Sequence, residues 1–332
     1  MIKTYFYSYE DRKTHHDVNL ADKDHFLKHE KDLLWVDLFQ FSELELKQVA
    51  GIFGFHPLAV EDCLHYSPRA KLDNYGDYDL LLVHALRYDE GSADDEIELV
   101  QLDIFLGRNF VVTVHHQTLP VLGRMARVSL SSPAYLNQGV EFFLYSIIDG
   151  NTDEIFPILD RINVRIDELE DEIYDQSSSA IAEEVLALKR TILTIRRAVM
   201  PQKRIFAGIN GRGQTNGRGQ TRFVIREESK PYFLDLVDHM ERITDSIDQF
   251  RDLVDTAQTT YYSLISARTN ETIRLLTVFS TLFMPLTFLT GFFGMNVPFP
   301  YQHSGLATVA ITMMLLGIVA IMLVVFKRLK LF

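Results

Sequence analysis

A stripe of small and oxygen-bearing side chains follows one face of an apolar stretch near the C-terminus. At about 100° per residue of an α-helix, its members fall within an arc of roughly 100°. They are Asn270, Ile273, Thr277, Ser280, Met284, Thr287 and Gly291. Hydroxyl and amide groups can line a polar path, but small residues and hydroxyls are also enriched where membrane helices pack together. The stripe alone therefore favours helix packing. The choice between helix packing and a polar path depends on the residues that follow the stripe.

Two charge-free segments of the chain are long enough to cross a membrane. Leu275–Phe293 and Leu306–Phe326 contain 19 and 21 residues, which matches a hydrocarbon core about 30 Å thick. Arg274 precedes the first segment, Lys327 and Arg328 follow the second, and the loop between the segments has no Lys or Arg. The positive-inside rule then places both termini in the cytoplasm. We predict a multi-pass protein of the inner (plasma) membrane.

The region before the first segment predicts one uninterrupted helix. Tyr232–Met284 contains neither Gly nor Pro, so a helix over this range would be about 80 Å long. Its first half is soluble and rich in aspartate, whereas its second half, from Leu275, is apolar enough to enter lipid. We expect residues 231–293 to form a stalk helix that continues into the first transmembrane helix.

The first 230 residues divide into two predicted parts. Residues 1–133 alternate β-rich runs, such as Glu96–Leu106, with helical stretches, which indicates a cytoplasmic α/β domain. Residues 134–230 predict a helical hairpin region with a glycine-rich loop at 210–221. In its first helix, apolar residues recur at spacings of three and four: Ile155, Leu159, Ile162, Ile166, Leu169 and Ile173. We predict a second helix of the same kind from about Ile181 to Val199. After the stalk we expect a motif and external loop at 294–305, a second transmembrane helix at 306–326 and a basic cytoplasmic tail at 327–332.

The composition excludes several classes of protein. The formal net charge is −12, and the first 270 residues alone carry −15, so the soluble part should repel nucleic acid and attract cations. Cys63 is the only cysteine, which excludes an intrachain disulfide and a cysteine-built metal cluster. The sequence has no P-loop and no His-Glu-x-x-His motif, and His115-His116 at a predicted strand end is structural or exposed. We therefore expect no enzymatic activity, no organic cofactor and no nucleic-acid partner.

Directly after the first transmembrane segment the sequence reads Gly294-Met295-Asn296. This tripeptide resembles the GMN signature of the CorA magnesium transporter family, the two-transmembrane metal ion transporters. The context agrees, because Thr269-Asn270-Glu271 opens the segment, Met284-Pro285-Leu286-Thr287-Phe288 lies within it, and Phe326-Lys327-Arg328 ends the second segment. With the acidic α/β domain and the stalk, the resemblance covers essentially the whole chain.

The resemblance implies a funnel-shaped homopentamer in the lipid bilayer, whose first transmembrane helices line one axial pore. Such an ion channel takes up Mg²⁺, and with it Co²⁺ or Ni²⁺, down the electrochemical gradient. Asn296 would form a ring at the outer mouth, where an amide oxygen suits the waters of hydrated Mg²⁺. Gly294 would keep the backbone turn open beside Met295 and Asn296.

The family pattern also assigns positions along the pore. Asn270 and Thr287 would supply polar rings, and the remaining stripe residues would also line the path. Leu276 and Met284 would match apolar constrictions, where a narrow dry pore blocks ions by dewetting. These residues, with the motif, make up the predicted ion pathway.

The resemblance further implies regulation by the cargo. In the family, Mg²⁺ bound between subunits of the cytoplasmic domain holds the pore shut. Asp235 matches a stalk-helix acid of such a site, and Asp89 is a candidate partner from the α/β domain. Paired carboxylates repel each other until a dication neutralises them, which links concentration to conformation. Both acids are otherwise ordinary members of solvated faces.

Two departures from the family pattern keep alternatives open. Phe293 stands where the family often has Tyr, and the loop Val297–Gly305 contains no acid, although many relatives carry a Glu there. Selectivity is therefore open between Mg²⁺ and the Zn²⁺ of ZntB-type proteins, which share the motif and the two-span layout. In a third interpretation the chain is a membrane-anchored metal sensor or scaffold, and the stripe only packs helices.

Overall fold

The computed structural model describes residues 1–88, 97–175, 179–209, 225–295 and 305–328. Contacts divide the chain into two units, Met1–Glu172 with Ser178–Ala257, and Ile173–Ser177 with Gln258–Phe332. Helix α9 (Lys230–Gly294) is continuous and belongs to both units. The predicted loop at 210–221 lies outside the described residues.

A seven-stranded sheet forms the centre of the first unit. In the order of the sheet, the strands are β2 (Lys13–His16), β1 (Ile2–Ser8), β3 (Leu33–Phe39), β7 (Phe110–His115), β6 (Ile97–Leu106), β5 (Asp79–Tyr88) and β4 (Lys71–Asn74). Strands β3 and β7 pair in parallel, with Leu34 opposite Phe110 and Phe39 opposite His115. The other neighbouring pairs are antiparallel. The sheet is therefore mixed and ends in short strands on both edges.

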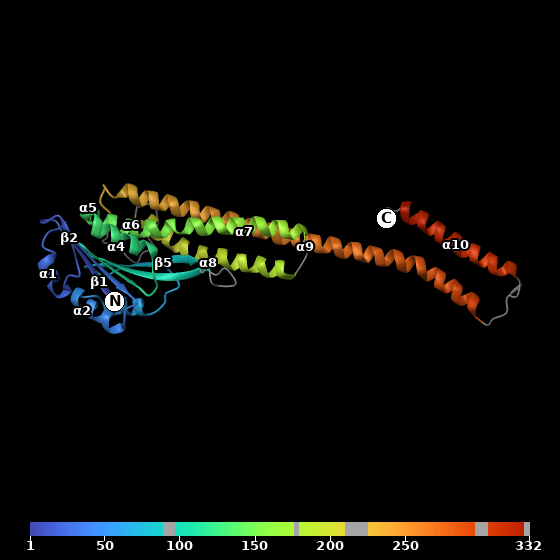
Figure 1. Cartoon of the computed structure of the whole chain (residues 1–332), viewed down its shortest axis with the longest axis horizontal. Coiled ribbons are helices and arrows are strands. Elements are labelled where there is room, and N and C mark those ends of the chain that lie inside the picture. Colours follow the sequence, from blue (N-terminus) through green and yellow to red (C-terminus); the bar gives the residue numbers. More distant parts are fainter. Residues whose placement is uncertain (89–96, 176–178, 210–224, 296–304, 329–332) are drawn as a thin grey trace. The chain divides into compact units, whose positions relative to one another are not determined.

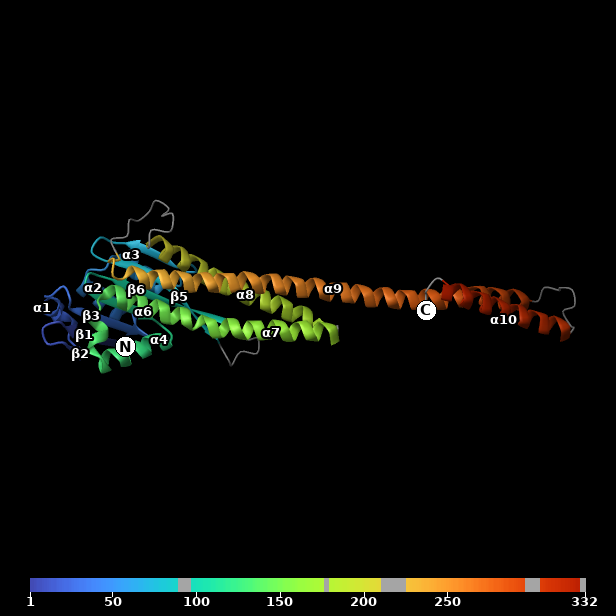
Figure 2. The same cartoon turned by 90° about the horizontal axis from the view of Figure 1, so that it is seen from above.

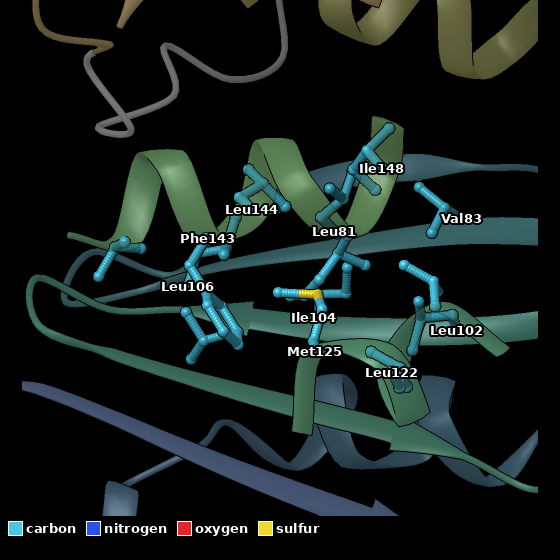
Figure 3. Packing of buried hydrophobic residues seen from close by; sticks show 14 of the residues in the cluster. Leu81, Val83, Leu102, Ile104, Leu106, Leu122, Met125, Phe143, Leu144 and Ile148 are labelled. Carbon is cyan, nitrogen blue, oxygen red and sulfur yellow. The ribbon is translucent and has the colours of Figure 1, made fainter. Parts of the chain in front are cut away.

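Both faces of the sheet are buried, because side chains alternate between its two sides along each strand. In β6, Leu102 and Ile104 join one core cluster, whereas Phe105 points into the other. Figure 3 shows the first cluster. Its side chains from β5, such as Leu81 and Val83, and from β6 pack against the helices that cover this face of the sheet. Continuous apolar runs such as Leu80–Val83 thus serve two cores at once.

Helices cover the two faces of the sheet. Helices α2 (Glu43–Phe53) and α3 (Pro57–Leu64) supply one cluster, and α4 (Pro120–Ser131) and α6 (Val140–Asp153) supply the other (Figure 3). The shorter helices are η1 (Leu20–Asp22), α1 (Lys23–Phe26) and α5 (Pro133–Leu136). Helix α2 begins at a complete capping box between Ser42 and Glu45. It ends at Gly54, whose φ of 70° suits a residue without a side chain.

Three long helices run side by side in the first unit: α7 (Ile155–Asp175), α8 (Ser179–Ile209) and the first half of α9 (Figure 1, Figure 2). The apolar face predicted for α7 is confirmed, because the six residues from Ile155 to Ile173 that define it are all buried. Ion pairs join α8 to α9, with Lys189 Nζ 2.6 Å from Asp255 Oδ1 and Arg196 Nε 3.2 Å from Asp248 Oδ1. The acids of the stalk helix thus have structural partners along part of its length.

The second unit contains the rest of α9 and helix α10 (Gly305–Arg328). Both helices are long and apolar enough to cross a membrane, and in each only 6% of the most apolar window is buried. A hairpin in a soluble core would be mostly buried, so this exposure fits lipid contact. The predicted fold class is confirmed, with an α/β domain, a long helix and two apolar C-terminal helices.

Candidate ion pathway and cation cluster

The stripe residues form an exposed face of α9. All seven stripe positions and Leu276 are exposed in the single chain, with Met284 at 77% and Leu276 at 66%. The buried or half-buried positions of the same stretch are Val278, Leu282, Pro285, Leu286, Leu289 and Phe293. At about 100° per residue, these positions centre roughly 160° away from the stripe. The stripe therefore lies on the face that this chain leaves uncovered.

Hydroxyl groups on this part of α9 bond back to their own helix. Thr277 Oγ1 donates to the carbonyl oxygen of Ile273 over 2.8 Å, and Thr290 Oγ1 donates to Leu286 over 2.9 Å. Such bonds satisfy the proton of the hydroxyl and leave its oxygen lone pairs to accept. The exposed Thr277 oxygen can thus accept a hydrogen bond from the water shell of a cation, although the bond also suits helix packing.

The motif begins where α9 ends. Gly294 is the last helical residue, and the backbone N–H of Met295 donates to Phe292 over 3.3 Å. Gly294 does not have a positive φ, and a Cβ there would have open space around it. A single subunit therefore gives no reason for a glycine at this position. Asn296 lies outside the described residues.

A second set of ligand atoms lies in the first unit, where α9 begins. Side-chain atoms of Asp149, Asp153 and His239 lie within 4.8 Å of one another. His239 Nδ1 is 3.4 Å from Asp149 Oδ1, and His239 Nε2 is 3.6 Å from Asp235 Oδ1. The structure therefore brings the predicted Asp235 beside an imidazole and two more carboxylates, which we call the cation cluster.

The electrostatics of the cation cluster favour a positive charge. Burial and the neighbouring Asp153 raise the pKa of Asp149. Burial and the Asp149 carboxylate also raise the pKa of Tyr145, which hydrogen-bonds to Asp149. Asp149 Oδ1 and His239 Nδ1 are buried, lie 3.4 Å from each other as an ion-pair contact, and make no hydrogen bond within the described part of the chain. A bound dication would relieve the repulsion among the carboxylates and would be held by both atoms.

Sequence reasoning found one residue of this cluster and missed three. Asp149 and Asp153 are one helical turn apart on α6, and His239 is one turn after Asp235 on α9, so each pair shares a helix face. Those spacings were a usable signal, but nothing in the sequence brings the two pairs together. The other predicted partner, Asp89, lies outside the described residues.

The two units together define the class of protein. An acidic α/β part is followed by a 65-residue helix that becomes apolar, and by one more apolar helix, which is the layout of a membrane protein with two spans and a large domain outside the membrane. Residues 30–328 match the family model described as "CorA-like Mg2+ transporter protein". The chain belongs to this family, as the motif predicted.

Individual relatives agree with the family. YfjQ of Bacillus subtilis, whose name describes a metal ion transporter, is 32% identical over 81% of this chain and 80% of its own length. The cobalt/magnesium transport protein CorA of Thermotoga maritima is 27% identical over 89% of this chain and 82% of its own length. Each match thus extends well beyond the membrane part.

The fold is similar to that of a solved full-length transporter. The CorA magnesium transporter of Methanocaldococcus jannaschii superposes with a TM-score of 0.83 at 18% identity, over 99% of this chain and 98% of the other. The zinc transport protein ZntB of Yersinia enterocolitica is less similar than the CorA of Thermotoga maritima, at 23% identity over 75% of this chain and 73% of its own length. The zinc interpretation is therefore weaker than the magnesium one.

Proposed function

We propose that this chain forms a channel for the uptake of Mg²⁺, with Co²⁺ and Ni²⁺ as further cargo, driven by the membrane potential. One observation carries the proposal, namely that the exposed stripe of α9 leads directly into Gly294-Met295-Asn296 in a member of the CorA-like Mg²⁺ transporter family. A potential of 100 mV acting on two charges supplies about 4.6 kcal/mol. A dication that enters a cell with an electrically negative interior would need no other energy source.

The same proposal assigns positions along the path. Asn296 forms the outer ring, Asn270 and Thr287 form polar rings, and Met284 and Leu276 form the apolar constrictions. Ile273, Thr277, Ser280 and Gly291 line the remaining path. These side chains offer neutral oxygen acceptors, which suit a cation that keeps its water shell.

A single helix cannot enclose a path, so the proposal includes assembly. Several copies must turn the exposed stripe toward one axis, and a pentamer is the state that the family resemblance implies. The protein would lie in the inner membrane with both termini in the cytoplasm, because Lys327 and Arg328 follow the second span. If cysteines are introduced at stripe positions, cross-links between neighbouring copies would report this arrangement.

We also propose that the cation cluster is the regulatory site. Asp235 and His239 lie on the helix that continues into the stripe, so a cation bound to them acts on the pore helix itself. Asp89 remains a proposed ligand from the α/β domain. The fit of the site rests on Asp149 Oδ1 and His239 Nδ1, two buried atoms that contact each other and make no hydrogen bond within the described residues.

Transport is tested in liposomes that contain the purified protein and a Mg²⁺-sensitive dye. Wild-type protein should admit Mg²⁺, and Asn296→Ala should abolish the influx, because the ring at the mouth is lost. Gln302→Ala removes another amide of the same loop and should retain influx. Zn²⁺, Co²⁺ and Ni²⁺ are added in parallel. Zn²⁺ flux without Mg²⁺ flux would favour a zinc transporter, and no flux of any dication would favour a scaffold.

Regulation is tested in the same liposomes by raising internal Mg²⁺. The wild-type influx should stop at high internal Mg²⁺, whereas Asp235→Asn should require at least several-fold more Mg²⁺ to close. Asp160→Asn changes an exposed acid of α7 outside the cluster and should close like wild type. Unchanged closure in Asp235→Asn would remove this residue from the regulatory site.

A further inference from the structure

A cavity of about 240 Å³ lies in the first unit beside the end of β5, bounded by α4, α6 and α7. Its apolar wall includes Leu86, Leu119, Pro120 and Ile158, and its polar wall includes Arg87, Thr118, Asn151, Glu154 and Arg161. None of the cation cluster residues lines it. The cavity is therefore a separate site, although Asn151 shares α6 with two cluster residues and Glu154 directly follows that helix.

Two arginines supply most of the charge of the cavity. Arg87 comes from β5 and Arg161 from α7. Arg87 Nη2 donates to Glu98 Oε2 over 2.7 Å, which uses one of the five N–H donors of a guanidinium group. Glu98 also accepts a hydrogen bond from Gln117. Its carboxylate is therefore already engaged by two donors, and Arg87 keeps donors for a further acceptor.

The carboxylate in the cavity wall is also engaged. Arg124 Nη1 donates to Glu154 Oε1 over 2.6 Å, and Arg124 does not itself line the cavity. The lining thus contains two guanidinium groups, of which Arg87 is paired with Glu98, and one carboxylate, which is paired with Arg124. Because a guanidinium group carries five N–H donors and no acceptor, the lining offers more donors than acceptors, which suits an anion.

A buried amide and a helix end point to the same ligand chemistry. Asn151 lines the cavity, is only 8% exposed, and its Nδ2 has no hydrogen-bond partner within the described residues. Leaving such a donor unpaired costs about 1–3 kcal/mol. Helix α4 begins at the cavity with Leu119 and Pro120, and no side chain caps it, so the positive end of its dipole adds to the field.

We propose that this cavity binds a small organic anion, in which a carboxylate or phosphate group is attached to an apolar body. The anionic group lies between Arg87 and Arg161, and the apolar body lies against Leu86, Leu119 and Ile158. The volume is below the 300–1,000 Å³ typical of drug-sized ligands, so the body is about as large as one six-membered ring. Binding here needs no ion transport and is measured separately from it.

Isothermal titration calorimetry on the full chain in detergent tests the site, with phenyl phosphate and benzoate as probes. One of the two probes should bind saturably, at one molecule per chain. Arg161→Gln removes a positive charge and Asn151→Asp adds a negative charge at nearly constant shape, and each should weaken binding at least tenfold. Arg190→Gln removes an exposed arginine of α8 that does not line the cavity, so it should bind like wild type.

Thermal unfolding of each variant shows whether it is folded. The two site variants change residues of different helices, so if one of them does not fold, the other still tests the proposal. The proposal is overturned if neither probe gives saturable heat, or if a folded site variant binds as tightly as Arg190→Gln. Inorganic phosphate serves as a third probe. If inorganic phosphate binds as tightly as phenyl phosphate, the proposal that the ligand has an apolar body is wrong.

Discussion

Asp103 of β6 is an acid inside the core of the α/β domain, where it is 2% exposed. Burial raises its pKa to about 7, and hydrogen bonds from Gln101 and Cys63 oppose the rise. Gln101 Nε2 donates to both carboxylate oxygens, over 2.9 and 3.1 Å. Asp62 and Lys71 face the same group with opposite effects on its pKa. The residue is therefore a carboxyl group that the fold holds close to its titration point at neutral pH.

Asp103→Asn should flatten the dependence of stability on pH. In the unfolded chain an aspartate titrates near pH 3.9, so between about pH 4 and 7 the folded protein holds a proton that the unfolded protein has released. The free energy of unfolding then falls as pH rises through this window, by up to about 1.4 kcal/mol per pH unit. Thermal unfolding from pH 4 to 8 measures the slope.

Asn at position 103 cannot titrate, so the free energy of unfolding of this variant should change less with pH over that range than that of the wild type. Asp24→Asn, at a side chain that is 93% exposed, is the control and should keep the wild-type slope. Equal slopes for wild type and Asp103→Asn would show that Asp103 is ionised in the folded protein throughout this range.

Thr113→Val should destabilise the α/β domain without changing its packing volume. Thr113 is fully buried, accepts a hydrogen bond from Trp35 Nε1 over 3.0 Å and donates to Asp37 Oδ1 over 2.6 Å. Valine leaves the indole N–H unpaired, which costs about 1–3 kcal/mol. Chemical denaturation measures the loss. Thr256→Val, at an exposed hydroxyl that bonds only to its own helix, should cost much less.

At the scale of elements, periodicity predicted what depends on one helix alone. The buried face of α7 and the continuity of α9 followed from apolar spacing and from the absence of Gly and Pro between Tyr232 and Met284. The predicted end of the second helix at Val199 was wrong, because α8 continues through Pro201 to Ile209. A proline removes one backbone hydrogen bond. Packing outweighs that loss, since Phe206 is fully buried and Gln202 Nε2 donates to the carbonyl of His84 over 3.0 Å.

The N-terminal strands of the sheet were harder to predict. Strand β1 begins at Ile2 in a segment that is neither strongly apolar nor bounded by a turn signal, and its partners lie at Leu33–Leu38. Pairing over such sequence distances depends on tertiary contacts rather than on local propensity. The prediction for His115 was correct, because the ring is buried and lies between Asp37 Oδ1 at 3.1 Å and the carbonyl of Gln117 at 2.6 Å.

Thr287→Val and Thr290→Val separate the ion pathway from helix packing within one element. Both changes replace a threonine by an isostere on α9, but only Thr287 belongs to the stripe. If the stripe lines the path, Thr287→Val should lower the initial rate of Mg²⁺ influx several-fold, since a polar ring becomes apolar. Thr290 bonds back to Leu286 and Thr287, so its variant should conduct like wild type. Equal rates for both variants would assign the stripe to packing.

At the scale of the whole molecule, the sequence could not predict the complete cation cluster, because its residues lie far apart in the sequence. Asp149 and His239 are separated by 90 positions, yet their ligand atoms lie 3.4 Å apart. The resemblance identified Asp235 because it matches a stalk-helix acid of the family, whereas the imidazole and the α6 carboxylates are brought to the site only by the fold. This mixture of donors matters, because imidazole nitrogen favours Co²⁺ and Ni²⁺ over Mg²⁺, which prefers oxygen.

The cation cluster should therefore bind Co²⁺ more tightly than Mg²⁺, and His239 should be the cause. A cation that binds only the folded protein stabilises it by about 2.7 kcal/mol at 100 times its Kd. Wild-type protein stripped with EDTA should thus gain Tm at a lower concentration of Co²⁺ than of Mg²⁺. His239→Ala should lose that preference and retain a response to Mg²⁺ through its carboxylates, whereas Asp149→Asn should weaken both responses. If His239→Ala kept the full preference for Co²⁺, the stabilising ion would bind elsewhere in the molecule.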